Sequence, residues 1–296
     1  MISVIIPTCH REASLLRIVF ALAANQENVA HEVIVTNDGP PLSLPVGRML
    51  AGLANVRVID TNARNVSVAR NAGAAAARGD ILAFLDDDIV PTPDWLSLVA
   101  RAFAQAGGTA GCALGAITGR VTSLVPGSRT LDTLRARIYE ARESRIVEGA
   151  RTDRLGVPAY GVNFLSGGNC AVARACFDAV DGFSPHYTKS QDRDLALKLL
   201  KAGKPVFYLP ELEVLHDNGY TDWFGLMRGR FLSGYFAIGL QHDHSGLFTA
   251  AAENGIGLSR SANLVERFAR VLWGSAFNLG LYAGQYGKFH ANRHAK

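Results

Sequence analysis

The chain has 296 residues, of which 48% are apolar and 19% charged, and its formal net charge at pH 7 is +4. This length accommodates one large α/β domain or two smaller ones with a substantial core. No dense Lys/Arg stripe with interleaved aromatic residues is present, which argues against a nucleic-acid-binding protein. The four cysteines form no CxxC pair and no Cys/His metal spacing, so free thiols in a reducing compartment are expected.

Targeting and membrane signals are weak along the whole chain. Residues 1–6 are too short for the apolar region of a signal peptide and lack a basic flank. No stretch reaches the roughly 18 apolar residues that a membrane-spanning helix needs. These patterns predict a cytoplasmic protein.

The first 85 residues alternate between short apolar runs and amphipathic segments. The runs predict strands, and the amphipathic segments predict helices. In chain order we expect residues 2–6 (strand), 12–25 (helix), 33–36 (strand), 56–59 (strand), 66–78 (helix, stopped at Gly79) and 81–85 (strand). Such alternation predicts a mainly parallel sheet with right-handed crossovers.

Three consecutive carboxylates at 86–88 follow the apolar run 81–85 directly. Ligands bind where the strands of an open α/β sheet end, and adjacent acids need a positive group to offset their repulsion. A divalent metal is the usual partner, although an acidic, solvated turn before Pro91 explains the same residues. Thr8 and Asp38 end two further strands, so the three polar strand ends are predicted to share one crevice.

The second half of the chain continues the α/β pattern. Expected elements are residues 93–106 (helix), 115–121 (strand), 164–172 (strand, glycine turn, strand), 190–201 (helix with Ser190 as N-cap), and 206–209 and 214–215 (strands). A lone histidine is usually structural, but His216 ends a strand as the carboxylates do. Asp192 lies in the first turn of a helix, where complementing the helix dipole is the simplest role. Residues 128–154 are charged, and a solvated surface helix is favoured over a mobile segment above the site.

The composition changes from residue 220 onward. Helices are predicted at residues 223–240 and 263–286, and the last 37 residues hold six Lys/Arg and one Glu. A basic helix with aromatic residues can lie on an anionic membrane surface. Packing of the same helix onto the preceding domain accounts for the pattern equally well.

Seven motifs of this chain occur in an order and with a spacing that a known protein family also has. They are Ser3-Val4-Ile5-Ile6-Pro7-Thr8, Asn37-Asp38-Gly39, Ala69-Arg70-Asn71-Ala72-Gly73, Phe84-Leu85-Asp86-Asp87-Asp88, Gly167-Gly168-Asn169 with Arg174, Gly182-Phe183, and Gln191-Asp192-Arg193-Asp194-Leu195. In this respect the chain resembles the inverting family 2 glycosyltransferases with the GT-A fold, over residues 1 to about 217. The resemblance implies an α/β fold in which a mainly parallel central sheet is flanked by helices. It also implies a GT-A domain at 1–219, with a donor half at 1–121 and an acceptor half at 155–219, followed by a C-terminal helical extension at 220–296.

The resemblance also implies roles for single residues. Asp192 matches the general base that takes the proton of the acceptor hydroxyl. In the DxD region Asp88 matches the direct metal ligand, which His216 completes in some relatives, and the metal would be Mg²⁺ or Mn²⁺. The nucleotide sugar would contact Pro7, Thr8, Arg11, Asp38, Arg70, Asp86 and Asp87, and the acceptor would contact Trp95, Gly168, Asn169 and Gln191. Among these, Asp38 would read the base edge, Arg70 would face the diphosphate, and Trp95 has a core role as its alternative.

Two positions depart from the family pattern. Gln191 stands where a glutamate usually precedes the base, and Asn65 stands where many relatives have glycine. The first change alters the charge beside Asp192 but keeps the base. Asparagine tolerates left-handed backbone angles, so the turn at Asn65 can survive.

The implied function is inverting transfer of a sugar from a UDP- or dTDP-linked donor to a hydroxyl acceptor. The acceptor would be a glycan or a lipid-linked molecule in bacterial cell-surface polysaccharide or glycolipid synthesis, in the cytoplasm or at the inner face of the membrane. A nucleotidyltransferase is the first alternative, but the loop at residues 8–12 lacks the glycines expected of its phosphate loop. A non-catalytic sugar- or membrane-binding module is the second, and it would not need Asp38, Asp88 and Asp192. The transferase is therefore preferred.

Overall fold

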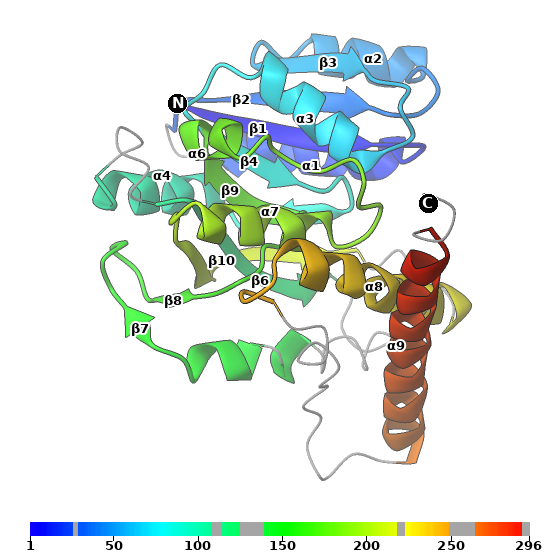
Figure 1. The fold of residues 1–296 in the computed structure, drawn as a ribbon. Coiled ribbons are helices and arrows are strands. Elements are labelled where there is room, and N and C mark those ends of the chain that lie inside the picture. The colour runs from blue at the N-terminus through cyan, green and yellow to red at the C-terminus, as the bar shows by residue number, and fades with distance from the viewer. Residues whose placement is uncertain are drawn as a thin grey trace. The chain divides into compact units, whose positions relative to one another are not determined.

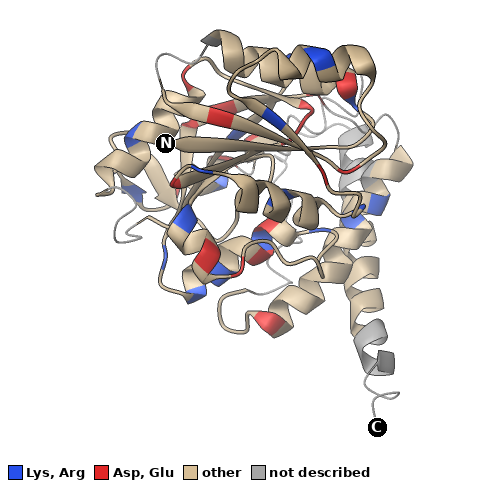
Figure 2. Cartoon of the chain, turned by 90° about the horizontal axis from the view of Figure 1, so that it is seen from above, with Lys and Arg blue, Asp and Glu red and all other residues tan. Residues whose placement is uncertain are grey.

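The computed structural model describes residues 1–25, 29–107, 114–124, 139–141, 143–217, 223–248 and 264–291. The chain divides into two compact units. The larger unit comprises residues 1–124 and 146–217, and the smaller unit comprises residues 125–145 and 218–296. Basic and acidic residues are interspersed along the described part of the larger unit in Figure 2.

Ten strands of the described residues form a mixed sheet at the centre of the larger unit (Figure 1). Its strands are β1 Ile2–Thr8, β2 His31–Asn37, β3 Val56–Asp60, β4 Ile81–Leu85, β5 Ile89–Pro91, β6 Ala116–Ser123, β7 Arg151–Thr152, β8 Ala159–Gly161, β9 Asn169–Ala173 and β10 Val206–His216. The order is β3-β2-β1-β4-β9-β6-β10-β8-β7, and β5 pairs with β10. Strands β3, β2, β1 and β4 are parallel, whereas β9 runs antiparallel to both β4 and β6.

Helices flank this sheet on both faces (Figure 1). They are α1 Glu12–Asn25, α2 Leu44–Ala51, α3 Val66–Ala76, α4 Trp95–Gln105, α6 Arg174–Ala179 and α7 Gln191–Lys201. Every residue of β1 and β4 is buried, as expected of apolar strands that are covered on both sides. The parallel strands β1, β2 and β4 therefore end at one edge of a rigid layer, and the polar residues that follow them are brought together there.

The predicted α/β class is confirmed, and so are β1 to β4 and α1 to within a few residues. Helix α3 ends at Ala76 instead of reaching residue 78, because Ala77 is extended and the Arg78 N–H donates to Glu32 instead of continuing the helix. The two strands predicted before and after residue 210 are one strand, β10, with a shift in register between Leu209 and Val214.

Helix α2 was not predicted, although a proline in its first turn, Pro45, is a recognised helix-start signal. The strand expected at 164–165 is absent from the described structure, where only Ser166 pairs, in an isolated bridge with Asn169. Most of the segment 128–154 lies outside the described residues; its described part includes helical residues 143–147 and strand β7.

The described part of the smaller unit contains helices α8 Trp223–Asp243 and α9 Leu264–Ala291, as predicted. Glycines allow the two helices to approach backbone to backbone. A Cβ atom at Gly234 would lie 2.1 Å from the carbonyl oxygen of Phe277, and one at Gly280 would lie 2.0 Å from that of Phe231. Neither helix, in its described residues, is long and apolar enough to cross a membrane.

Candidate functional site

A cavity of about 910 Å³ opens where β1, β2 and β4 end. Its lining residues come from the end of β1, from the loops that follow β1 to β4, and from the starts of α3 and α7. They are Pro7, Thr8, Cys9, His10, Arg11, Asp38, Gly39, Pro40, Asn62, Arg64, Asn65, Val66, Ala69, Arg70, Asp86 and Gln191. All but Asp87 of the residues predicted to contact a nucleotide sugar thus line one cavity.

Asp87 is buried beneath the loop that follows β1. Its side chain is 0% exposed; it accepts a hydrogen bond from the Thr8 hydroxyl at 2.7 Å and forms an ion pair with the Arg11 guanidinium, also at 2.7 Å. Burial raises the pKa of Asp87 to about 6, against the opposing effects of Thr8 and Arg11. In this structure Asp87 does not line the cavity, contrary to what its predicted contact with the nucleotide sugar requires, and instead contacts two residues that do, Thr8 and Arg11.

Asp88 is held between two basic side chains. The Arg11 guanidinium bonds one carboxylate oxygen, and His216 Nε2 lies 3.4 Å from the other. Burial raises the pKa of Asp88, but His216 and Arg11 outweigh it, so the pKa lies below its ordinary value. Asp88 and His216, the two predicted metal ligands, are thus brought together. No group of three or more His, Cys, Asp or Glu side chains suited to a metal occurs among the described residues.

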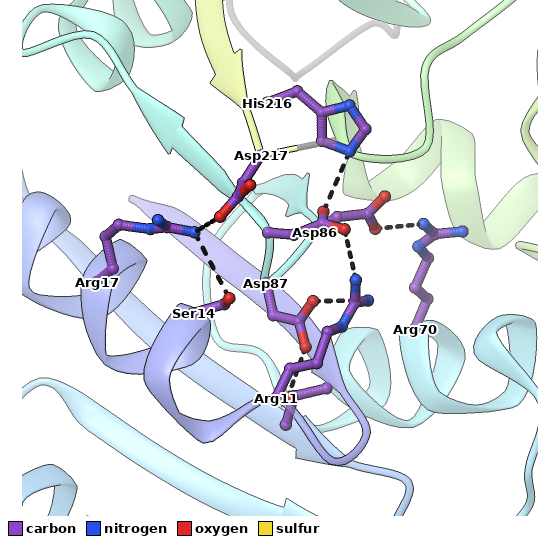
Figure 3. A network of polar contacts seen from close by, with 10 residues as sticks. Arg11, Ser14, Arg17, Arg70, Asp86, Asp87, His216 and Asp217 are labelled. Atoms are coloured by element: carbon purple, nitrogen blue, oxygen red, sulfur yellow. Dashed lines mark hydrogen bonds and ion pairs between the residues drawn. The ribbon is translucent and has the colours of Figure 1, made fainter. Parts of the chain in front are cut away.

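A second ion pair lies beside this cluster and was not anticipated from the sequence. Arg17 on α1 donates to Asp217 at 2.7 Å and to Ser14 at 3.5 Å (Figure 3). The backbone N–H of Asp217 also donates to the Asp88 carbonyl at 2.8 Å. These contacts tie the end of β10, and with it His216, to α1 and to the acidic loop. No local sequence signal links residues 200 positions apart.

Arg70 and Asp86 form an ion pair at the wall of the cavity, with 2.7 Å between Nη2 and Oδ1. Arg70 is only 2% exposed, and its guanidinium lies 5.2 Å from the ring centre of Phe183. Its Nε and Nη1 atoms have no hydrogen-bond partner among the described residues. A buried cation with unused donors in a cavity wall favours an anionic ligand there.

Asp38 organises the loop after β3. Its Oδ1 accepts hydrogen bonds from the Thr61 hydroxyl and from the N–H groups of Ala63 and Arg64, at 2.6–2.9 Å. Its Oδ2 accepts one from the Asn65 N–H at 2.7 Å. Asn65 in turn caps α3 by accepting from the N–H of Ser67 and Val68. Asp38 therefore shapes the cavity wall, a role that the sequence did not indicate.

Asp192 and Gln191 begin α7 and face different neighbours. Asp192 Oδ2 accepts a hydrogen bond from the Gly167 N–H at 3.1 Å, and Gln191 lines the cavity. Ser190 is at the N-cap position, as predicted, but it has a left-handed φ of 65° and its side chain makes no capping hydrogen bond. The candidate base thus lies against the glycine turn, and its neighbour faces the cavity.

Trp95 and Asn169, both expected to contact an acceptor, are instead fully buried. The Trp95 Nε1–H donates to Asn169 Oδ1 at 2.9 Å, and the Asn169 amide donates to the carbonyls of Arg120 and Leu212. Neither side chain reaches a surface in this structure, so both assignments are corrected. An indole buried with a partner for its N–H is a common core arrangement.

Curated relatives match much of the chain at low sequence identity. The "Pre-mycofactocin glycosyltransferase" of Mycobacterium tuberculosis is 27% identical over 225 residues, which cover 75% of this chain and 44% of that protein. The "O-antigen chain rhamnosyltransferase RfbN" of Salmonella typhimurium is 26% identical over 249 residues, covering 81% of this chain and 72% of that protein. The chain therefore spans less than half the length of the mycobacterial relative.

Solved structures of GT-A glycosyltransferases share the fold. The mannosyltransferase PcManGT from Pyrobaculum calidifontis, solved with GDP-Man and Mn²⁺, is 17% identical with a TM-score of 0.57, over 99% of this chain and 79% of that one. TarS 1-349 of S. aureus, solved with UDP-GlcNAc, is 14% identical with a TM-score of 0.58, over 95% of this chain and 81% of that one. The sequence profile described as "Glycosyl transferase family 2" matches residues 3–180, more than half of the chain, and the chain therefore belongs to glycosyl transferase family 2.

Proposed function

We propose that the protein transfers a sugar, with inversion, from a nucleotide diphosphate sugar to a hydroxyl acceptor. The observation that carries the proposal is the cavity at the strand ends, which gathers Arg11, Asp38, Arg70 and Asp86 beside the start of α7. The family membership supports the reaction class. The volume of about 910 Å³ is within the usual range for a site that encloses a small ligand.

Two residues of the cavity suit two parts of the proposed donor, its negatively charged diphosphate and its base. Arg70 offers unused N–H donors to a diphosphate, since planar guanidinium groups match phosphate oxygens well. Asp38 Oδ2 accepts one hydrogen bond within the loop and retains a lone pair for the imide N–H of uracil or thymine. The proposed donor is accordingly a UDP- or dTDP-linked sugar.

Asp88 and His216 fit a divalent metal that is shared with the donor. A carboxylate oxygen and an imidazole nitrogen lie 3.4 Å apart, and that oxygen has no hydrogen-bond partner among the described residues. Mg²⁺ commonly takes one or two carboxylates and completes its shell with phosphate oxygens and water, so a third protein ligand is not required. When bound, Mg²⁺ or Mn²⁺ would offset negative charge on the departing diphosphate.

Asp192 is the proposed general base. Its carboxylate lies in the first turn of α7. An ionised carboxylate beside the acceptor hydroxyl accepts its proton as the oxygen attacks the anomeric carbon. Gln191, one position earlier, lines the cavity, which supports a base next to the proposed donor site.

The acceptor is proposed to be a glycan or a lipid-linked molecule of the bacterial cell surface. The matched relatives include proteins named for O-antigen chain rhamnosyl transfer and, in Escherichia coli, for chondroitin synthesis. Gly168 and Gln191 are retained as acceptor-side residues, whereas Trp95 and Asn169 are not. The catalytic domain is proposed to end near residue 219, with the donor half before residue 121.

The metal assignment is tested with the Asp88→Ala variant. We expect Mn²⁺ to increase the affinity of the wild-type protein for UDP, and to increase that of the variant by less than about twofold, because the carboxylate that would hold the ion is gone. Isothermal titration of UDP with and without Mn²⁺ measures both. Asp178→Ala, which removes an exposed acid on α6, serves as the control. Equal metal dependence in wild type and Asp88→Ala would remove Asp88 from the site.

The exposed face of α9 is proposed to contact an anionic membrane surface. Val271, Leu279 and Tyr282 are 64%, 64% and 74% exposed and lie on one side of the helix. Residues 260–296 hold six Lys/Arg and one Glu, a charge that complements anionic lipid and would repel a second copy of the same helix.

Co-sedimentation with vesicles tests this surface. Wild-type protein is expected to bind phosphatidylglycerol vesicles and to lose most of that binding on Leu279→Asp/Tyr282→Asp substitution. Phosphatidylcholine vesicles should bind neither protein. If the double variant binds as well as wild type, or if no vesicle binds the wild-type protein, α9 is not a membrane contact.

A further inference from the structure

The turn at residues 166–169 lies between the donor cavity and the candidate base, and three hydrogen bonds define it. The Asn169 N–H donates to the Ser166 carbonyl at 2.9 Å and closes the turn. The Thr118 hydroxyl accepts from the Ser166 N–H at 3.0 Å and donates to the Asn169 carbonyl at 2.7 Å. The turn is thus held by hydrogen bonds to buried polar groups, which favours a single conformation.

The buried pair of Trp95 and Asn169 is part of this support. The Asn169 amide bonds the indole of Trp95 and the carbonyls of Arg120 and Leu212. Those carbonyls belong to β6 and β10, and Trp95 begins α4, so the turn is joined through Asn169 to two strands of the sheet and one helix. Two residues that cannot reach a ligand therefore still determine where the turn lies.

On the cavity side, the two glycines of the turn pack directly on the Arg70–Asp86 ion pair. A Cβ atom at Gly168 would lie 2.5 Å from Asp86 Oδ2 and 2.7 Å from its Cγ. A Cβ atom at Gly167 would lie 2.9–3.1 Å from the Arg70 guanidinium. The Asp86 side chain is short and paired with Arg70, so a methyl group at Gly168 requires the carboxylate to move. Glycine is needed here for close approach, and neither residue has a positive φ.

On its other side, the same turn holds the candidate base. The Gly167 N–H donates to Asp192 Oδ2 at 3.1 Å, and the Arg193 N–H donates to Asp192 Oδ1 at 2.8 Å. These two bonds orient the carboxylate, the first of them from outside its own helix. One turn therefore contacts the ion pair in the donor cavity through its Cα atoms and the base through an amide.

We propose that the Gly167-Gly168 turn is a positioning element of the transfer site, which sets the Asp192 carboxylate relative to the Arg70–Asp86 pair. The inference rests on the proposed transferase function and adds to it an element that keeps the base aligned with the donor site. Aligned groups contribute strongly to rate, and a displacement of about 1 Å can reduce turnover about 100-fold. Movement of this turn should accordingly affect turnover as well as donor binding.

The test uses the full chain with Gly168→Ala as the main variant. Nucleotide release is measured from UDP-glucose, UDP-galactose, UDP-N-acetylglucosamine, dTDP-rhamnose and GDP-mannose, and kinetics are taken on the donor with the highest rate. Gly161→Ala is the matched control, because a Cβ atom at Gly161 meets nothing within 4 Å. Gly168→Ala is expected to weaken UDP binding in the presence of Mn²⁺ about tenfold and to lower kcat by about 10- to 100-fold. Gly161→Ala should change neither.

A double-mutant comparison separates positioning of the base from shaping of the donor cavity. In the Asp192→Asn background the additional loss of kcat caused by Gly168→Ala should shrink to about twofold, because the positioned group is already absent. An equal loss in both backgrounds would overturn the proposal, since the turn would then act on the donor alone. Kinetics of Gly168→Ala that match Gly161→Ala would overturn it as well.

A second variant covers the case in which Gly168→Ala does not fold. Trp95→Phe removes the N–H that supports Asn169 and leaves the residues that line the cavity unchanged, so its smaller displacement of the turn should lower kcat several-fold and weaken UDP binding by no more than about twofold. Unchanged kcat would contradict the proposal. If the wild type releases no nucleotide, or if Asp192→Asn is fully active, the proposed function fails. If those controls behave as expected and the turn variants do not, only the positioning role fails.

Discussion

Asp192→Asn is expected to slow sugar transfer by about 10²–10⁴-fold while leaving UDP binding within about twofold of wild type. The amide cannot accept a proton at neutral pH, yet it has nearly the shape of the carboxylate. Its oxygen can still accept the hydrogen bond that the Gly167 N–H donates at 3.1 Å. The change therefore removes the basic group without dismantling its surroundings.

The comparison for Asp192→Asn is Asp178→Asn, an exposed acid on α6. Rates are measured as nucleotide release under saturating donor, and binding is measured by titration with UDP. Full activity of Asp192→Asn would rule out its role as the base. Loss of UDP binding together with activity would assign Asp192 to the donor site instead.

Asp38→Asn is expected to lower the free energy of unfolding by about 3 kcal/mol and to weaken UDP binding by at least about tenfold. The carboxylate accepts hydrogen bonds from Thr61 and from the N–H groups of residues 63–65. Asparagine offers one oxygen and turns its own N–H groups toward the remaining donors. The loop also contains Asn62 and Arg64, both with φ of 50°, which need such support.

Urea denaturation of Asp38→Asn gives the change in stability, provided that the slope of the transition is unchanged. Asp153→Asn is a suitable control, because the Asp153 side chain is 65% exposed. A change in free energy below about 0.5 kcal/mol, within the usual range for surface substitutions, would contradict the organising role of Asp38. Weaker UDP binding without loss of stability would instead indicate that Asp38 acts by contacting the base directly.

The sequence predicted the elements that depend on local pattern. Apolar runs such as Ile81–Leu85 and the helical periodicity of Glu12–Asn25 are properties of short segments, and both elements occur with those bounds. Pairing across the sheet then placed Thr8, Asp38 and Asp86 at one edge, as expected of parallel strands. The position of the candidate site was therefore predictable before any side-chain geometry was known.

The roles of individual side chains were less predictable, because burial and long-range pairing decide them. The sequence left Trp95 open to an acceptor role or a core role and assigned Asn169 to the acceptor side; only their mutual hydrogen bond and complete burial place both residues in the core. Asp87 and Asp88 are adjacent, yet Asp87 is buried beneath Thr8 whereas Asp88 faces His216. The Arg17–Asp217 pair joins residues that no local pattern relates.

The central claim is that the cavity binds a nucleotide diphosphate sugar together with a divalent metal. The most direct test is a thermal-shift panel of UDP-, dTDP- and GDP-linked sugars, each with Mn²⁺, with Mg²⁺ and with chelator. A ligand that binds only the folded protein raises the melting temperature, by an amount that grows with its concentration. We predict a shift that depends on metal and is largest for one UDP- or dTDP-linked sugar. The absence of any metal-dependent shift across the panel would contradict the account.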